Sequence, residues 1–145
     1  MKVLLTGSSK GIGYKIANDL LAEGHELALH YNKNESPLSA LLKKDKTGSF
    51  SIQADLSKQE EIKKMVENTI GKLSFPDCII NNAGIAESAD ISLDTNEWSK
   101  MFDKTIDVNL KAPSIIFKEF LKYKRKKKIN SRLRIINIAS RAAFR

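Results

Sequence analysis

The chain has 145 residues, of which 41% are hydrophobic, a length and composition that suit one folded domain and argue against intrinsic disorder. Its formal net charge of +8 is local, because nine Lys/Arg residues and a single acid lie in residues 118–134, while the other 16 basic and 16 acidic residues cancel. Such a run is usually a solvated helix end and loop. A phosphate-binding patch is the minority interpretation, since no aromatic-rich stacking motif accompanies the lysines.

The same overview excludes several other classes. The single cysteine, Cys78, permits no internal disulfide, which suits a reducing compartment. Only three apolar residues, Val3–Leu5, precede a glycine-rich turn, too few for a signal-peptide core, and no stretch approaches a membrane-spanning length. We therefore expect a cytoplasmic protein without a membrane partner, and no motif suggests a metal site.

The first half of the chain predicts three strands and two helices. Residues 3–5 form the first strand, and a glycine-rich turn leads from it into a helix that Gly24 ends. Residues 27–31 form the second strand. A Ser-Pro pair then gives the cap and first turn of a helix over residues 36–42. Residues 50–54 form the third strand.

The second half predicts two strands and two helices. The capping box Ser57–Glu60 opens a helix with an amphipathic stripe, and residues 78–80 form the fourth strand. A long helix follows from Asp94 to about Lys122. The apolar run at 135–138 is the fifth strand, with isoleucines on both of its faces.

Alternation of strands and helices predicts a parallel sheet with crossover helices. Right-handed crossovers and a reversal after the third strand give the order 3-2-1-4-5, an α/β fold of the Rossmann-type, doubly wound kind. Residues 1–145 then form one domain, an NAD(P)-binding Rossmann domain truncated after its fifth strand. A ligand is expected at the carboxyl ends of the first and fourth strands.

The glycine-rich turn is T-G-S-S-K-G-I-G at residues 6–13, between a predicted strand and a predicted helix. Small residues let a pyrophosphate approach the backbone, where free N–H groups at a helix N-terminus bind negative charge. An ordinary tight turn explains glycines equally well. The spacing G-x-x-x-G-x-G differs from the commoner G-x-G-x-x-G.

This spacing resembles that of the short-chain dehydrogenase/reductase family, and four further segments do so in the same order. They are Asp55-Leu56, the N-N-A-G of residues 81–84, Asn109 and Ser140. Singly, Asp55 suits an ordinary turn, Asn109 a solvated helix position and Ser140 a helix cap. Jointly they extend the resemblance over essentially the whole chain.

The resemblance implies a set of residues that contact the dinucleotide. They are Gly7, Ser9, Lys10, Gly11, Ile12, Gly13, Asn32, Lys33, Asp55, Leu56, Asn82, Ala83 and Gly84.

Charge near the cofactor ribose favours NADP(H) over NAD(H). The position where an acid would bind a free 2′-hydroxyl is Asn32, so no carboxylate there repels a 2′-phosphate. Lys33 and Lys10 supply positive charge that attracts one. The alternative is that both are surface lysines at loop tips.

For catalysis, the family uses Asn, Ser, Tyr and Lys, and the resemblance assigns the first two to Asn109 and Ser140. The tyrosine and lysine belong to a Tyr-x-x-x-Lys that follows the serine, and no tyrosine follows Ser140 in these 145 residues. The earlier match, Tyr123 with Lys127, is rejected because it precedes Ser140 and points toward the opposite edge of the sheet. We therefore expect the catalytic set to be incomplete and the chain to be inactive alone.

Two functional hypotheses follow. The first is an NADP-dependent oxidoreductase that reduces a small-molecule carbonyl, with 3-oxoacyl-thioester reductases as the most similar subgroup, although His30-Tyr31 is also similar to pteridine reductases. The second is a non-catalytic NADP(H)-binding module. The exposed fifth strand predicts a homo-oligomer or a completing chain. Nucleic-acid binding through Lys122–Lys128 is a distant third hypothesis.

Overall fold

The computed structural model describes residues 1–86 and 90–140, which contain one sheet of five parallel strands in the order β3-β2-β1-β4-β5. The strands are β1 (Lys2–Leu5), β2 (Glu26–Tyr31), β3 (Phe50–Gln53), β4 (Cys78–Asn81) and β5 (Arg134–Asn137). The predicted fold class and strand order are confirmed.

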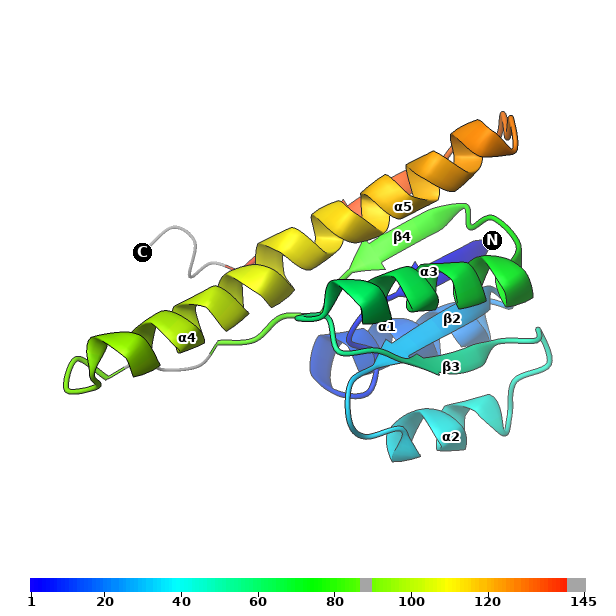
Figure 1. Cartoon of the computed structure of the whole chain (residues 1–145). Coiled ribbons are helices and arrows are strands. Elements are labelled where there is room, and N and C mark those ends of the chain that lie inside the picture. The colour runs from blue at the N-terminus through cyan, green and yellow to red at the C-terminus, as the bar shows by residue number, and fades with distance from the viewer. Residues whose placement is uncertain (87–89, 141–145) are drawn as a thin grey trace.

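Helices cover both faces of this sheet (Figure 1). They are α1 (Gly11–Ala22), α2 (Ser36–Leu42), α3 (Gln59–Leu73), α4 (Thr95–Ile106), the π-helical turn η1 (Asp107–Lys111) and α5 (Ala112–Lys126). Side chains of α1 and α2 pack on one face, and those of α3 and α5 pack on the other.

The central strand β1 shows how the sequence fills two cores. Val3 and Leu5 join the core under α1 and α2, whereas Leu4 between them joins the core under α3 and α5. Side chains alternate along a strand, so a sheet covered on both sides needs uninterrupted apolar runs. The consecutive apolar residues at 3–5 are therefore the sequence signature of a buried central strand.

The ends of the first two helices agree with the sequence to within a residue. Gly24 follows α1 with φ of 76°, a conformation that favours glycine, as predicted. Ser36, however, is the first residue of α2 and not its cap, and its N–H donates to Asn34 Oδ1 at 3.0 Å. Pro37 lies in the first turn as expected, where its missing N–H has no helical partner to lose.

The capping box predicted at Ser57 and Glu60 is wrong. Both the hydroxyl and the N–H of Ser57 donate to Asp55 Oδ1, at 2.7 and 3.0 Å, and α3 begins only at Gln59. An aspartate two residues upstream competes for the serine by forming a local turn. Glu60 pairs instead with Lys63 along the helix.

The predicted long helix is present and runs to Lys126, beyond the expected end near Lys122. Asp94 caps it through Oδ1, which accepts from the N–H groups of Asn96 and Glu97 at 2.8 and 3.1 Å. The π-helical turn η1 interrupts it and was not predicted. Helix α4 extends past the sheet (Figure 1), and none of its residues is buried.

Apolar side chains remain exposed on α4 and on the edge strand. Trp98 and Phe102 stack with ring centroids 5.4 Å apart, yet are 43% and 50% exposed. Ile136 and Ile138, in and just after β5, are 46% and 38% exposed, as the sequence predicted for this edge. Within the described residues, no helix has both the length and the apolar character needed to span a membrane.

Candidate functional site

The glycine-rich turn leaves β1 and enters α1 at the carboxyl edge of the sheet. A Cβ at Gly13 would lie 2.2 Å from the oxygen of Gly7 and 2.4 Å from Asn82 Nδ2, closer than real atoms approach. Gly7 itself has φ of 66°, and a Cβ there would meet Ala83 Cα at 2.7 Å. The turn is therefore packed directly against the loop that follows β4, and only glycine fits at these two positions.

Hydrogen bonds join the same two loops. Asn82 Nδ2 donates to the backbone oxygens of Thr6 and Gly7, each at 3.0 Å. In return Thr6 Oγ1 accepts from the N–H groups of Asn82 and Ala83, each at 3.0 Å. Thr6 is 1% exposed, so these bonds are shielded from water. The structure thus brings the predicted residues of 6–13 and 82–84 together.

A buried histidine, His30, contacts this turn from β2. Its Nδ1 accepts from the N–H of Gly7 at 3.0 Å, and its Nε2 lies 2.9 Å from the oxygen of Ala54. Burial lowers the pKa of His30, although the Ala54 carbonyl and the charge of Asp55 oppose that effect. The imidazole is thus held in its neutral form.

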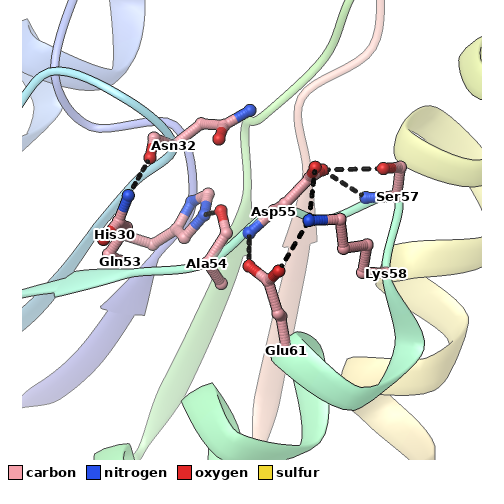
Figure 2. Close-up of polar contacts among 8 residues, drawn as sticks. All are labelled: His30, Asn32, Gln53, Ala54, Asp55, Ser57, Lys58 and Glu61. Atoms are coloured by element: carbon pink, nitrogen blue, oxygen red, sulfur yellow. Dashed lines mark hydrogen bonds and ion pairs between the residues drawn. The ribbon is translucent and has the colours of Figure 1, made fainter.

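The end of β2 carries the residues predicted to choose between the two dinucleotides. The backbone oxygen of Asn32 accepts from Gln53 Nε2 at 2.8 Å (Figure 2), and the residue is exposed. Lys33 and Lys10 are both exposed. A carboxylate does lie three residues after Asn32, at Glu35, and it accepts a hydrogen bond from the Ser51 hydroxyl.

Asp55 lies at the end of β3 in a small polar cluster (Figure 2). Its carboxylate accepts from Ser57 and lies 3.7 Å from Lys58 Nζ, while its N–H donates to Glu61 Oε2 at 2.7 Å. Burial of the Asp55 carboxyl opposes ionisation, but the hydrogen bonds from Ser57 and the charges of Lys58 and Lys104 outweigh it. The pKa of Asp55 therefore lies below its ordinary value.

Asn109 lies in the middle of the π-helical turn. Its Oδ1 accepts from the N–H of Ile85 at 2.9 Å, and its Nδ2 donates to the oxygen of Ile85 at 2.8 Å. This two-way contact fixes the loop after β4 against the long helix. Single π-helical turns occur frequently at functional sites. This one contains Asn109, the residue that the sequence had singled out.

Ser140 follows β5 and is exposed. Pairing with β4 continues to Ile138, two residues earlier, whose N–H donates to the oxygen of Asn81 at 2.9 Å. The side chains of Asn81 and Asn137 also meet across the two strands at 2.8 Å. Ser140 therefore leaves the sheet at the same edge as the glycine-rich turn, as parallel pairing requires.

Tyr123 lies at the other edge. Its ring stacks on that of Phe75, which precedes β4, with centroids 6.5 Å apart and planes 9° apart. The chance match of Tyr123 with Lys127 is therefore remote from the carboxyl edge.

Sequence reasoning missed Thr6, His30 and Glu61 as parts of this site. Thr6 stands in the turn motif, but its bonds to the loop after β4 depend on sheet pairing between segments 76 residues apart. A histidine inside an apolar strand is a visible signal for His30. Nothing local predicts that Glu61 accepts from the backbone of Asp55.

Comparison with known proteins places these features in a family. The family model for short chain dehydrogenase matches residues 1–145. A 3-oxoacyl-(acyl-carrier-protein) reductase of Staphylococcus epidermidis is 35% identical over 113 residues, covering 75% of this chain and 45% of that protein. The L-fucose dehydrogenase of Mus musculus is 30% identical over 138 residues, covering 95% of this chain and 48% of that protein.

Solved structures show the same fold. A blue fluorescent protein from a metagenomic library, in complex with NADPH, superposes with a TM-score of 0.80 at 28% identity, over 99% of this chain and 57% of that one. The chain spans about half the length of the curated relatives it matches. It belongs to the short chain dehydrogenase family of oxidoreductases.

Proposed function

We propose that this chain binds NADP(H) at the carboxyl edge of its sheet and forms the cofactor-binding half of a carbonyl reductase. The observation that carries the proposal is the turn at 6–13, which enters the N-terminus of α1 and tolerates no Cβ at Gly13. Close backbone approach and free N–H groups at a helix start are what a pyrophosphate requires.

The residues at this edge fit a dinucleotide. The turn would hold the pyrophosphate, Asp55 and Leu56 the adenine, and residues 82–84 the adjoining nucleoside. Lys33 and Lys10 give positive charge at the 2′ position, and the residue at 32 is an asparagine and not an acid. When bound, NADPH supplies a hydride to a carbonyl carbon.

Two residues of the chain are proposed to take part in the reduction. The Ser140 hydroxyl would donate to the developing oxyanion. The Asn109 amide, which bonds both backbone groups of Ile85, would hold the loop that borders the reacting centre. A general-acid tyrosine and its lysine would have to come from polypeptide outside these 145 residues, so we propose that the chain alone binds cofactor without turnover.

The proposed substrate class is a 3-oxoacyl thioester. The Staphylococcus relatives, at 34–35% identity, support it by name. The second candidate is a non-catalytic NADP(H)-binding module, and it needs only the turn, Asp55 and Asn82. The position of these residues at one edge of the sheet supports it.

A binding titration tests the cofactor proposal. We expect NADPH to bind more tightly than NADH, and Lys33→Glu to reverse that order by lowering NADPH affinity about tenfold or more through like-charge repulsion. Lys46→Glu makes the same charge change on the turn before β3, at the opposite edge, and should leave both affinities unchanged. Equal binding of NADPH and NADH by the wild type, or equal effects of the two variants, would contradict the preference.

Turnover separates the two functional candidates. The 145-residue chain should bind NADPH without oxidising it in the presence of a 3-oxoacyl thioester. The same chain, extended or mixed with a segment that supplies Tyr-x-x-x-Lys, should oxidise NADPH if it is half of a reductase. Binding that never leads to turnover favours the module.

A further inference from the structure

We propose that His30 is a positioning residue for dinucleotide binding, which sets the orientation of the glycine-rich turn through Gly7 and Ser8. The inference rests on the proposed cofactor site. A residue of β2 thereby sets the position of the turn that connects β1 to α1.

The ring of His30 has one arrangement that satisfies both of its partners. The N–H of Gly7 can only donate, so Nδ1, 3.0 Å away, must be its acceptor. The oxygen of Ala54 can only accept, so Nε2, 2.9 Å away, must carry the proton. The residue is 2% exposed, and the tautomer is therefore fixed by its contacts as neutral Nε2–H.

The backbone of His30 holds the next residue of the turn. Its carbonyl oxygen accepts from both the N–H and the hydroxyl of Ser8, each at 2.9 Å. Parallel pairing between β1 and β2 ends at Leu5 and Leu29, so these bonds guide the chain just where it leaves the sheet. They also commit the N–H groups of Gly7 and Ser8 to β2, which leaves those at the start of α1 to face an anion.

His30 bonds to the glycine-rich turn and to the residue before Asp55, and both segments are assigned cofactor contacts. The ring accepts from the glycine-rich turn through Nδ1. On its other side it contacts Ala54, the neighbour of Asp55 (Figure 2). Along β2 it lies two residues before Asn32. An apolar side chain would fill the same space but would bond neither Gly7 nor Ala54. The ring therefore both fills space in the core and holds the turn through its hydrogen bond to Gly7.

Two variants, each of which keeps one polar atom of the ring, separate an effect on the position of the turn from an effect on packing. In His30→Asn the amide oxygen takes the place of Nδ1 and keeps an acceptor for Gly7. In His30→Gln the amide nitrogen takes the place of Nε2 and keeps a donor for Ala54, but nothing accepts from Gly7. Each variant loses one ring hydrogen bond, so both should be destabilised to a similar extent.

The first measurement is calorimetric titration of NADP⁺ into the 145-residue chain at pH 8, alongside thermal melting. His30→Asn should bind within about threefold of the wild type, whereas His30→Gln should bind about tenfold or more weakly at similar stability. His25→Gln changes the other histidine of the chain and should leave binding unchanged. Affinities that fall equally in both His30 variants, in step with melting temperature, would overturn the inference.

The second measurement needs no cofactor and covers a chain that fails to bind. Ring nitrogen shifts should report the neutral Nε2–H form in the wild type, and the Gly7 amide should be protected from hydrogen exchange in His30→Asn but not in His30→Gln. An Nδ1–H tautomer, or equal protection in both variants, would overturn the inference. Absence of NADP⁺ binding by the wild type with these signatures intact would instead reject the proposed function.

Discussion

Gly13 allows the glycine-rich turn and the loop after β4 to pack closely because it has no side chain. Gly13 stands against the oxygen of Gly7 and the amide of Asn82 at distances that no Cβ could share. The sequence showed the glycine but could not show its neighbours, because Asn82 is brought there by β4.

Gly13→Ala tests this contact. The added methyl must push the turn away from the loop after β4, so we expect a loss of about 1–3 kcal/mol in the free energy of unfolding and at least about tenfold weaker NADP⁺ binding. Urea unfolding and titration calorimetry measure the two effects. Gly71→Ala on α3 is the matched control, since among the described residues the new Cβ would meet no atom within 4 Å beyond its chain neighbours and its own helix backbone. It should be neutral or slightly stabilising. Similar losses in both variants would contradict the steric argument.

The buried imidazole of His30 makes stability depend on pH. Because burial lowers its pKa below the ordinary value of 6.5, the unfolded chain takes up a proton that the folded chain resists. Stability should therefore be full above about pH 6.5 and fall as the pH drops from there toward the lowered pKa of the folded state.

Urea midpoints at pH 8 and pH 5 measure this dependence. The wild type should lose more stability between them than His30→Asn, which does not titrate. Asp55, which faces His30 from β3, has a lowered pKa and contributes its own loss only as the pH falls below its ordinary value of 3.8, outside this window. Equal losses in wild type and variant would show that His30 is not the group responsible.

At the scale of elements, the long helix consists of α4, η1 and α5, which differ in burial and in contacts. Ile116 and Phe120 on α5 are buried against the sheet, whereas no residue of α4 is buried. The π-helical turn between them presents Asn109 to Ile85. The sequence predicted one continuous helix and could not predict this turn, because the bonds to Ile85 that accompany it are tertiary.

Removal of the Asn109 side chain should release the loop after β4. In Asn109→Ala both bonds to Ile85 are lost, and we expect faster hydrogen exchange at the Ile85 amide and a stability loss of about 1 kcal/mol, since the site is exposed. Asn109→Asp keeps the acceptor but sets a carboxylate against the Ile85 oxygen, so Ile85 should stay only partly protected. Asn68→Ala on exposed α3 surface is the control. An Ile85 amide that remains fully protected in the alanine variant would refute the assignment.

At the scale of the whole molecule, exposed apolar side chains lie on α4 and in and just after β5, among other places. The stacked pair Trp98 and Phe102 and the edge residues Ile136 and Ile138 are each exposed. Exposed apolar side chains that lie together often mark an interaction surface. We propose that a second copy or a completing chain covers them.

Sedimentation velocity tests this association. The chain should sediment as an oligomer, or aggregate, at micromolar concentration. The double variant Trp98→Glu, Phe102→Glu should shift it toward monomer, because neither residue supports the core. Glu97→Gln on the same helix should not change the distribution. A wild-type chain that is already a monodisperse, cooperatively melting monomer would exclude the idea.

The sequence by itself determined the order of the elements and the composition of the turn. Apolar runs such as 3–5 and 78–80 have the uninterrupted pattern of strands covered on both faces. Right-handed crossovers and a reversal after the third strand then give the strand order. Glycine spacing at 6–13 identified the turn because positive φ values such as that of Gly7 favour glycine.

The tertiary structure alone decided how those residues meet. The bonds of Asn82 to Thr6, of His30 to Gly7 and of Asn109 to Ile85 join residues that are 23 to 76 positions apart and follow no local periodicity. The capping box predicted for α3 from its local motif is also absent, because Ser57 bonds to Asp55 instead. Hydrogen bonds depend on positions to within a few tenths of an ångström, and only the packed sheet sets positions that closely.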